Sequence, residues 1–395
     1  MMHDISTLRN DTPGCSHVNH LNNAGASLQP RPVLQAVQDH LLLESTTGGY
    51  EAADQRADEI NGFYGTVARM LNAQARNIAF ASSATDAYAR ALSALNWQPG
   101  DVILTTENDY VSNQIAFLAL QKRFGVVLLR ARDTASGGVD VDHFESLLIQ
   151  HRPRLAAVTH IPTSSGLIQP VEAIGRICRA HETLYLVDAC QSAGQRRLDV
   201  QAIGCDFLTA TMRKFMRGPR GSGFLYVSDR VLDGGYELLL PDMSGGNWVS
   251  PDQYEMAASA RRFEYWELPP ALILGGKAAV EYAENLGFEW IENQVMQIAR
   301  FTRETLAQLP GVRVLDQGEQ LGGIVTAHAS HWNQAEILSK LVKHGINCRI
   351  STKQVAQIDF GHKGVEWALR VSPHYYNTED EIRQLAEVLK QEFPV

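Results

Sequence analysis

The chain has 395 residues, of which 45% are hydrophobic and 20% charged, so it holds enough apolar material for a large core shared between two domains. This composition excludes disordered and collagen-like chains. The formal net charge is -9, and no basic cluster is interleaved with aromatic residues, so nucleic acid is a poor candidate partner.

The N-terminus lacks a basic region followed by an apolar run, and no stretch of about 18 consecutive apolar residues occurs. The sequence therefore predicts a cytoplasmic protein without membrane insertion. The five cysteines are scattered and show no CxxC spacing, which argues against a disulfide framework or a zinc site. We expect isolated thiols and no metal centre.

Short apolar runs alternate with amphipathic segments between about residues 75 and 230. This rhythm is typical of parallel strands joined by helices, and so of an α/β fold. Ligand sites in such sheets gather at the carboxyl ends of the strands. Strands are expected at 101–106, 125–130, 155–161, 183–189, 207–210 and 223–227, and helices are expected to start near Thr85, Ser112 and Pro170.

The pattern changes after Trp266, where a long helical stretch is followed by short strands and further helices. We expect an N-terminal arm over 1–20, a large domain over 21–265 and a smaller α+β domain over 266–395. Within the smaller domain, strands are expected near Val312 and Gly323, through Cys348 and at 367–371, and helices at 333–344 and from Thr378.

One segment places an acid and an amide at the polar end of an apolar strand. Asp188 and Gln191 belong to the run D-A-C-Q, and Lys214 follows in a Gly-rich turn. A carboxylate at a strand end is by itself often only a capping residue. A lysine held in a tight loop at the same edge can form a Schiff base with an aldehyde cofactor, so Asp188 and Lys214 together predict one site.

Pyridoxal phosphate needs a lysine for its aldehyde, a carboxylate at the pyridine nitrogen, a flat group over the ring and a cradle for the phosphate. Lys214 and Asp188 match the first two needs, and Gln191 is a candidate contact to the phenolic oxygen. Tyr110 is the candidate ring cover, although a tyrosine after a strand is also a common core residue. The helix expected to start near Thr85 offers free backbone amides that could bind the phosphate. Ser or Thr at a helix start is also common as an ordinary N-cap, without any ligand. The candidate phosphate cradle consists of Ser83, Ala84, Thr85, Thr211 and Arg213.

Seven motifs follow one another along the chain: NNAG, S-A-T, Y-x-S-N, P-T-S-S-G, D-A-x-Q, T-x-R-K and R-V-S-P-H-Y-Y-N-T. In this order they resemble the class V branch of fold-type I pyridoxal-phosphate enzymes, which includes cysteine desulfurases, kynureninase, isopenicillin N epimerase-like proteins and carbon-sulfur lyases. The resemblance covers nearly the whole chain. It implies a mainly parallel seven-stranded sheet flanked by helices, a smaller C-terminal domain, pyridoxal 5'-phosphate as cofactor, an amino acid as substrate and a homodimer.

The resemblance also implies roles for single residues. It makes Lys214 the Schiff-base lysine and supports the ring and phosphate contacts above. Arg370 falls where the family clamps the substrate α-carboxylate, a task that suits a bidentate guanidinium; without the family, a surface ion pair would explain this arginine. Asn22 and Asn23 match a segment that lines the substrate entrance. Thr163 stands where the family often has an asparagine that contacts the phenolic oxygen.

Departures from the family pattern reduce the number of reactions that this chain is expected to catalyse. A desulfurase of this kind would carry a nucleophilic cysteine on the loop after the strand near Arg349, and the run ISTKQVAQIDFGHKG contains none. Cys348 is expected inside the strand itself, which argues against persulfide chemistry by the usual route. The runs RKFMRGPRGSGFLYV and RRFEYWE look most similar to the hercynylcysteine sulfoxide lyases of the ergothioneine pathway and to isopenicillin N epimerase-like proteins.

We therefore expect a carbon-sulfur β-lyase that acts on a cysteine conjugate or its sulfoxide and releases pyruvate and ammonia. Lys214 would take the α-proton as the general base. A class V aminotransferase and an epimerase would use the same residues, because all three reactions begin with loss of that proton. Both alternatives stay open at this point.

Overall fold

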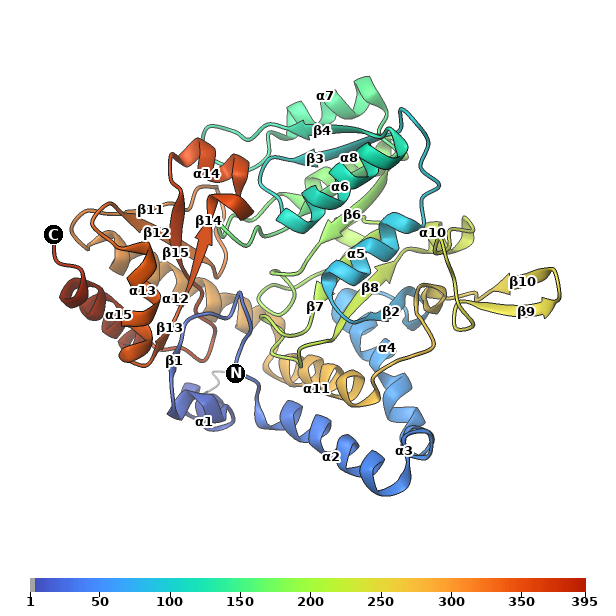
Figure 1. Ribbon diagram of the computed structural model, residues 1–395, viewed down its shortest axis with the longest axis horizontal. Helices are drawn as coiled ribbons and strands as arrows, with labels where there is room; N and C mark the ends of the chain where they lie inside the picture. The colour runs from blue at the N-terminus through green and yellow to red at the C-terminus, as the bar shows by residue number, and fades with distance from the viewer. Residues whose placement is uncertain (1–3) are drawn as a thin grey trace.

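The computed structural model describes residues 4–395, and its largest element is a seven-stranded sheet with helices on both faces (Figure 1). β8 runs opposite to both its neighbours, and β3, β4, β5, β6 and β7 are parallel to one another, which confirms the expected α/β fold. In spatial order the strands are β2 (Ile78–Ala81), β8 (Gly223–Val227), β7 (Phe207–Thr211), β6 (Leu184–Asp188), β5 (Leu155–Thr159), β3 (Val102–Thr106) and β4 (Val127–Ala131).

Six of these strands overlap the ranges expected from the sequence, and β2 was not expected. β2 has four residues, IAFA, of which two are alanines, so its local β-propensity is weak. All four are buried, and the strand pairs along its whole length with β8. Tertiary packing therefore makes this strand.

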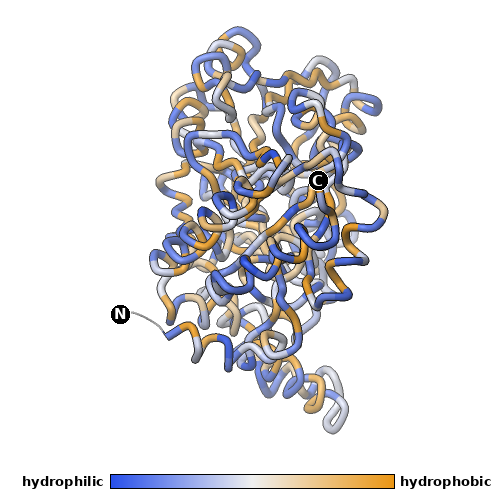
Figure 2. The backbone as a smooth tube through the Cα atoms, turned by 90° about the vertical axis from the view of Figure 1, so that its left-hand side faces the viewer, coloured by the Kyte–Doolittle hydropathy of each residue, from blue (hydrophilic) through white to orange (hydrophobic). Residues whose placement is uncertain are grey.

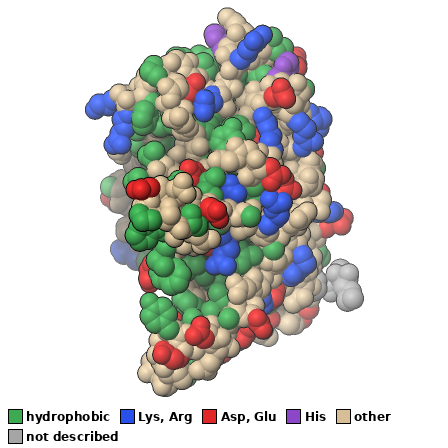
Figure 3. All heavy atoms as spheres, turned by 90° about the vertical axis from the view of Figure 1, so that its right-hand side faces the viewer, with side chains coloured by type: hydrophobic (Ala, Val, Ile, Leu, Met, Phe, Trp, Pro, Cys, Tyr) green, Lys and Arg blue, Asp and Glu red, His purple; other side chains and the backbone are tan. Residues whose placement is uncertain are grey.

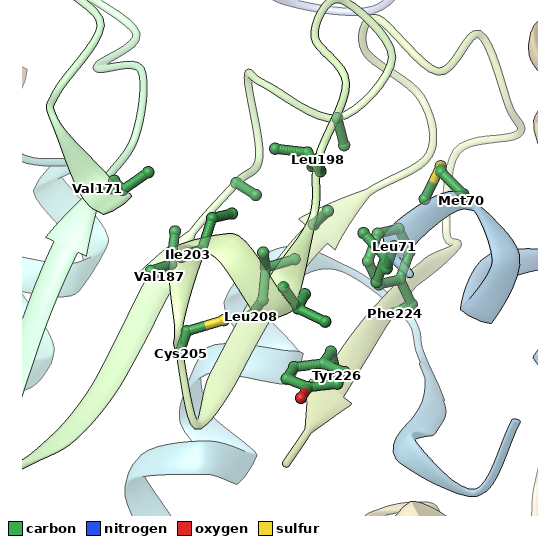
Figure 4. Close-up of a cluster of buried hydrophobic side chains, with 14 of the residues drawn as sticks. Met70, Leu71, Val171, Val187, Leu198, Ile203, Cys205, Leu208, Phe224 and Tyr226 are labelled. Atoms are coloured by element: carbon green, nitrogen blue, oxygen red, sulfur yellow. The ribbon is translucent and has the colours of Figure 1, made fainter. Parts of the chain in front are cut away.

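Successive side chains of a strand point to opposite faces, so the sheet has a hydrophobic core on each side. Tyr185 and Val187 belong to one core, and Leu184 and Leu186 belong to the other. Figure 4 shows part of the first core, where Val187 lies beside Ile203 and Phe224 lies beside Leu71. The first core is covered by α4 (Ala57–Leu71), α7 (Val141–His151), α8 (Val171–Ala180), α9 (Val200–Ile203) and α11 (Pro270–Leu286), and the second by α5 (Ala84–Ser93), α6 (Val111–Phe124) and α10 (Asp229–Asp233).

A second sheet is antiparallel and has a core of its own. Its strands, in spatial order, are β11 (Val312–Val314), β12 (Val325–Ala329), β15 (Trp367–Val371) and β14 (Arg349–Thr352). The helices beside it are α12 (Phe288–Ala307), α13 (Gln334–Lys343), α14 (Gln357–Lys363) and α15 (Glu379–Glu392). The domain limits 1–20, 21–265 and 266–395 stay a prediction.

The strand expected through Cys348 is divided at that residue. β13 (Ile346–Asn347) ends before Cys348, and β14 begins after it. β13 pairs in parallel with β1 (Asn19–His20), whereas β14 joins the four-stranded sheet. The N-terminal segment therefore lies against the C-terminal part of the chain, beside the residues that approach the site described below.

In the described part of the chain, three α-helices and one hairpin lie outside the two sheets and the helices beside them (Figure 1). α1 (Ile5–Asn10), α2 (Arg31–Thr47) and α3 (Gly49–Gln55) come from the N-terminal region, and a hairpin of β9 (Gly246–Ser250) and β10 (Gln253–Met256) projects from the body. Hydrophobic and hydrophilic residues alternate along the outer helices (Figure 2), as expected where one helix face is solvated. Within residues 4–395, no helix combines the length and the apolar character that crossing a membrane requires.

Candidate active site

The carboxyl ends of β3, β5, β6 and β7 meet at one edge of the large sheet, and Asp188 is the last residue of β6. Its carboxylate is buried. Oδ1 accepts a hydrogen bond from the Cys190 backbone N–H (2.8 Å), and Oδ2 accepts one from the Asn113 amide (3.1 Å). Burial raises the pKa of the Asp188 carboxyl, while both donors and the Lys214 ammonium act in the opposite direction.

Lys214 follows β7 in a turn that packs against the loop after Asp188. Gly194 in that loop has φ +91°, and a Cβ there would lie 2.3 Å from the Met216 backbone nitrogen, so the close approach requires glycine. The Lys214 side chain is 6% exposed and forms no ion pair with any carboxylate in the described part of the chain. Its amine shares a hydrogen bond with the Cys190 thiol. The fold therefore holds a buried amine near Asp188, and the two charges attract each other without forming an ion pair.

Tyr110 is the N-cap of α6, at the end of the turn that follows β3. Lys214 Nζ lies 5.8 Å from the centroid of the Tyr110 ring, so the structure brings the predicted ring cover to the predicted Schiff-base lysine. The first turn of α6 also carries Asn113, the Asp188 partner that sequence reasoning did not single out. The sequence did contain a signal for this residue, because Asn113 is the last residue of the family motif Y-x-S-N.

Thr163 connects residues that come from both sheets. Gln191 Nε2 donates to Thr163 Oγ1 (2.8 Å) and to the Ala24 carbonyl oxygen (3.1 Å). Arg370, on β15, donates from one terminal nitrogen to Thr163 Oγ1 (2.7 Å) and from the other to Asn22 Oδ1 (3.2 Å). Arg370, Thr163, Gln191 and Asn22 therefore form one hydrogen-bonded group at the edge where Asp188 lies.

Arg370 is a buried cation without a carboxylate partner within residues 4–395. Burial and repulsion from Arg349 and Arg213 lower the pKa of Arg370 to about 10. Its Nε is buried and has no hydrogen-bond partner. A buried guanidinium with an unused N–H is costly unless an anion completes it, so this geometry favours a bound carboxylate or phosphate.

The candidate phosphate cradle lies at the N-terminus of α5, directly after β2. Ser83 is the N-cap, and its hydroxyl accepts a hydrogen bond from the Asp86 backbone N–H (3.1 Å). The Thr85 side chain is exposed. Thr211 Oγ1 donates to the Ser222 carbonyl oxygen (3.2 Å), and Arg213 donates to the Gly25 carbonyl oxygen. The free amides of the first turn, which begins at Ala84, complete an arrangement suited to an anion.

Asn23 has a different environment from Asn22. Its side chain is fully buried, and Nδ2 donates to the Ser372 carbonyl oxygen (2.8 Å). Its Oδ1 accepts from the Tyr376 hydroxyl. Asn23 thus joins the N-terminal segment to the segment after β15, whereas Asn22 contacts Arg370 directly.

Lys214, Asp188 and Arg370 place three charged groups in one buried region, and none of them forms an ion pair within residues 4–395, although Lys214 and Asp188 attract each other. Buried charges are expensive unless partners complete them. The Lys214 amine matches an aldehyde, the Asp188 carboxylate matches a protonated ring nitrogen, and Arg370 with the α5 N-terminus matches anionic groups. Gln191 Oε1, which is buried and without a partner, adds an unused acceptor. These residues fit pyridoxal 5'-phosphate and an amino acid, so fold and site together define a pyridoxal-phosphate enzyme.

Comparison with known proteins supports this class. The family model described as aminotransferase class V matches residues 19–385. The chain therefore belongs to the class V aminotransferase family, whose cofactor is pyridoxal 5'-phosphate. The family resemblance inferred from the seven motifs, and the cofactor it implied, are confirmed.

Individual relatives carry names that concern carbon-sulfur chemistry. A probable cysteine desulfurase from Methanothermobacter thermautotrophicus is 29% identical over 398 residues, with 97% of each chain covered. The apo structure of a cysteine desulfurase from Thermococcus onnurineus NA1 superposes with a TM-score of 0.91 at 25% identity and covers 100% of this chain and 99% of its own. The cystine C-S lyase C-DES, in complex with cysteine persulfide, superposes with a TM-score of 0.85 at 23% identity and covers 95% of this chain and 98% of its own.

Proposed function

We propose that this enzyme cleaves the Cβ–S bond of a cysteine-derived amino acid, a conjugate or its sulfoxide, by β-elimination, and that pyruvate and ammonia are the other products. One observation supports elimination over transfer of sulfur to the protein. The segment 353–363, which follows β14, contains no cysteine, and the nearest one, Cys348, is buried. Burial raises the pKa of Cys348 to about 12, so this thiol is a poor nucleophile near neutral pH.

Different residues of the chain would have different roles in this reaction. When bound, pyridoxal phosphate supplies an aldehyde for the substrate amine and a ring that accepts electrons from a bond broken at Cα. Asp188 would keep the ring nitrogen protonated, and Arg370 would hold the substrate carboxylate with two N–H groups. Lys214 Nζ, between Tyr110 and Cys190, would take the α-proton as general base.

The overall reaction balances without an oxidant or a reductant. The Cα–H and Cβ–S bonds break, and the sulfur group leaves with the bonding electron pair and takes up a proton. One water molecule then converts the remaining three-carbon fragment to pyruvate and ammonia. A sulfoxide substrate would release a sulfenic acid in place of a thiol.

The three proteins named above support carbon-sulfur cleavage, although two of them are named desulfurases. Cys190 is the candidate thiol for such a mechanism, because it interacts with the Lys214 amine. Burial raises the pKa of Cys190, and Lys214 opposes this effect. Cys190 and Cys348 therefore provide a direct test between elimination and sulfur transfer.

We expect Cys348→Ser and Cys190→Ser to retain release of both sulfur product and pyruvate, because elimination needs no thiol from the protein. The measurement is the initial rate of pyruvate formation and of sulfide or thiol formation from the same cysteine conjugate. Cys178→Ser, at a buried cysteine of the first core, is the matched control for the effect of a thiol on stability. A rate that collapses in Cys190→Ser alone, with alanine as the other product, would refute elimination in favour of desulfuration.

The aminotransferase and epimerase alternatives share the first proton transfer and differ in products. Transamination would convert the cofactor to pyridoxamine phosphate and form a keto acid that retains the sulfur group. Epimerisation would exchange the α-proton with solvent deuterium and release neither product. Assaying pyruvate, pyridoxamine phosphate and deuterium incorporation in one reaction separates all three.

We also propose a homodimer that uses the β9–β10 hairpin and the segment before it. This region exposes large apolar side chains, and the face seen in Figure 3 shows hydrophobic groups among charged ones. Exposed apolar clusters of this kind mark protein interfaces more often than free surface. The exposed residues are Leu239, Leu240, Met243, Trp248, Val249 and Tyr254.

Trp248→Glu combined with Tyr254→Glu is expected to convert the dimer to a monomer, because two carboxylates would lose their hydration in an apolar interface. Light scattering at several protein concentrations measures the change. Ile149→Glu, an exposed apolar residue of α7, is the control and should leave the dimer intact. A wild-type protein that is monomeric at all concentrations would exclude the dimer.

A further inference from the structure

A second carboxylate lies behind Asp188, and the function proposed above does not use it. Asp109 is in the turn between β3 and α6. Its Oδ1 accepts hydrogen bonds from the Tyr110 backbone N–H (2.7 Å), the Asn113 amide (3.1 Å) and the Thr159 hydroxyl. Its Oδ2 accepts from the Gln114 amide (2.7 Å). No Lys, Arg or His in the described part of the chain forms an ion pair with it.

Asn113 connects the two carboxylates. Its Nδ2 lies 3.1 Å from Asp109 Oδ1, 3.1 Å from Asp188 Oδ2 and 3.2 Å from Thr159 Oγ1. If the amide were turned over, its oxygen would face two carboxylate oxygens, which is repulsive. Asp109 and Asp188 therefore favour the same orientation of the Asn113 amide, and Asp109 reinforces the one in which Nδ2 points to Asp188.

The network continues to a cation at the edge of the sheet. Arg130, on β4, donates from Nε (2.9 Å) and from a terminal nitrogen (2.8 Å) to Gln114 Oε1. Gln114 then donates from its Nε2 to Asp109. Hydrogen bonds in such a chain polarise one another, and the low dielectric of the interior strengthens them. The Asp109 carboxylate is thus held in place by neutral donors. Burial raises its pKa, and the hydrogen bonds from Thr159, Gln114, Asn113 and the Tyr110 backbone act in the opposite direction and favour the charged form.

We propose that Asp109 is a positioning residue that orients Asn113 toward Asp188 and adds negative charge behind it, so that the pyridine nitrogen of the cofactor stays protonated. The proposal rests on the role proposed above for Asp188. Charge at this place acts on the ring nitrogen because a nearby negative charge stabilises a protonated base. Asp109 itself touches neither cofactor nor substrate in this assignment.

The test uses Asp109→Asn, which keeps the shape of the side chain and removes its charge. Apoprotein is titrated with pyridoxal phosphate to measure affinity, and cofactor labelled with nitrogen-15 at the pyridine nitrogen reports ring protonation as a function of pH. We expect the affinity to fall roughly tenfold, the scale of one lost charged hydrogen bond, and the ring nitrogen to lose its proton at lower pH than in wild type. Asp109→Glu should restore both values in part.

Asp140→Asn is the matched control, because Asp140 also precedes a helix and accepts a backbone hydrogen bond, from His143, but lies in a different loop. If Asp109→Asn folds poorly, Asn113→Ala tests the same connection between Asp109 and Asp188, because it removes the amide that joins them. It should shift both measurements in the same direction, and the double variant should shift them no further than the larger single effect.

Two results separate the failure of this inference from failure of the Asp188 assignment. If Asp109→Asn and Asn113→Ala lower only the melting temperature, with unchanged affinity and ring titration, the positioning role is wrong. If Asp188→Asn also leaves the ring titration unchanged, the role proposed for Asp188 is wrong as well.

Discussion

Replacing Lys214 with alanine is expected to abolish turnover, with a loss of at least about 10²–10⁴-fold, the range attributed to a general base. The same change removes the amine that would hold the cofactor aldehyde. Lys214 is buried, contacts Cys190 and lies over Tyr110, and it has no ion-pair partner among residues 4–395 that would give it a purely structural role. The expected loss therefore comes from chemistry and not from unfolding.

Borohydride reduction followed by mass spectrometry measures the covalent link to the cofactor, and pyruvate formation measures turnover. Wild type should show the mass of the protein plus the reduced cofactor, and Lys214→Ala should show the mass of the protein alone. Lys122→Ala, an exposed lysine of α6, is the control and should behave as wild type. Undiminished turnover in Lys214→Ala would contradict the assignment of the site.

Arg370→Lys is expected to raise KM roughly 10- to 100-fold while leaving cofactor binding unchanged. Lysine keeps the positive charge but offers no planar pair of N–H groups, and a hydrogen bond to a charged group contributes about 1.5–3 kcal/mol. The loss should be specific to substrates with a carboxylate. A substrate amide in place of the acid should bind wild type and variant with similar affinity.

Arg349→Lys provides a matched control for this prediction. Arg349 is directly opposite Arg370 in the β14–β15 pair, yet it is exposed and makes no contact with Thr163 or Asn22. Steady-state kinetics on both variants should therefore separate the two neighbouring arginines. Equal changes in KM would assign the effect to general electrostatics, and an unchanged KM in Arg370→Lys would exclude a carboxylate clamp.

Local patterns were sufficient to predict most of the large sheet. Six strands were expected because each contains a short apolar run, which one segment of sequence reveals. The run does not give the strand direction, and β8 proved antiparallel to both its neighbours. Asp188 and Lys214 were expected at one edge because the carboxyl ends of parallel strands must meet there. β2 was missed because its four residues have little β-propensity of their own, and pairing with β8 stabilises it.

The sequence by itself determined the α/β class, the family motifs and the residue types that a pyridoxal-phosphate site needs. The tertiary structure decided which side chains touch. Thr163 binds Arg370 from the other sheet, and Asn113 joins Asp188 to Asp109. A hydrogen bond requires donor and acceptor about 3 Å apart, and that distance depends on how loops far apart in the chain pack together, which no local pattern records.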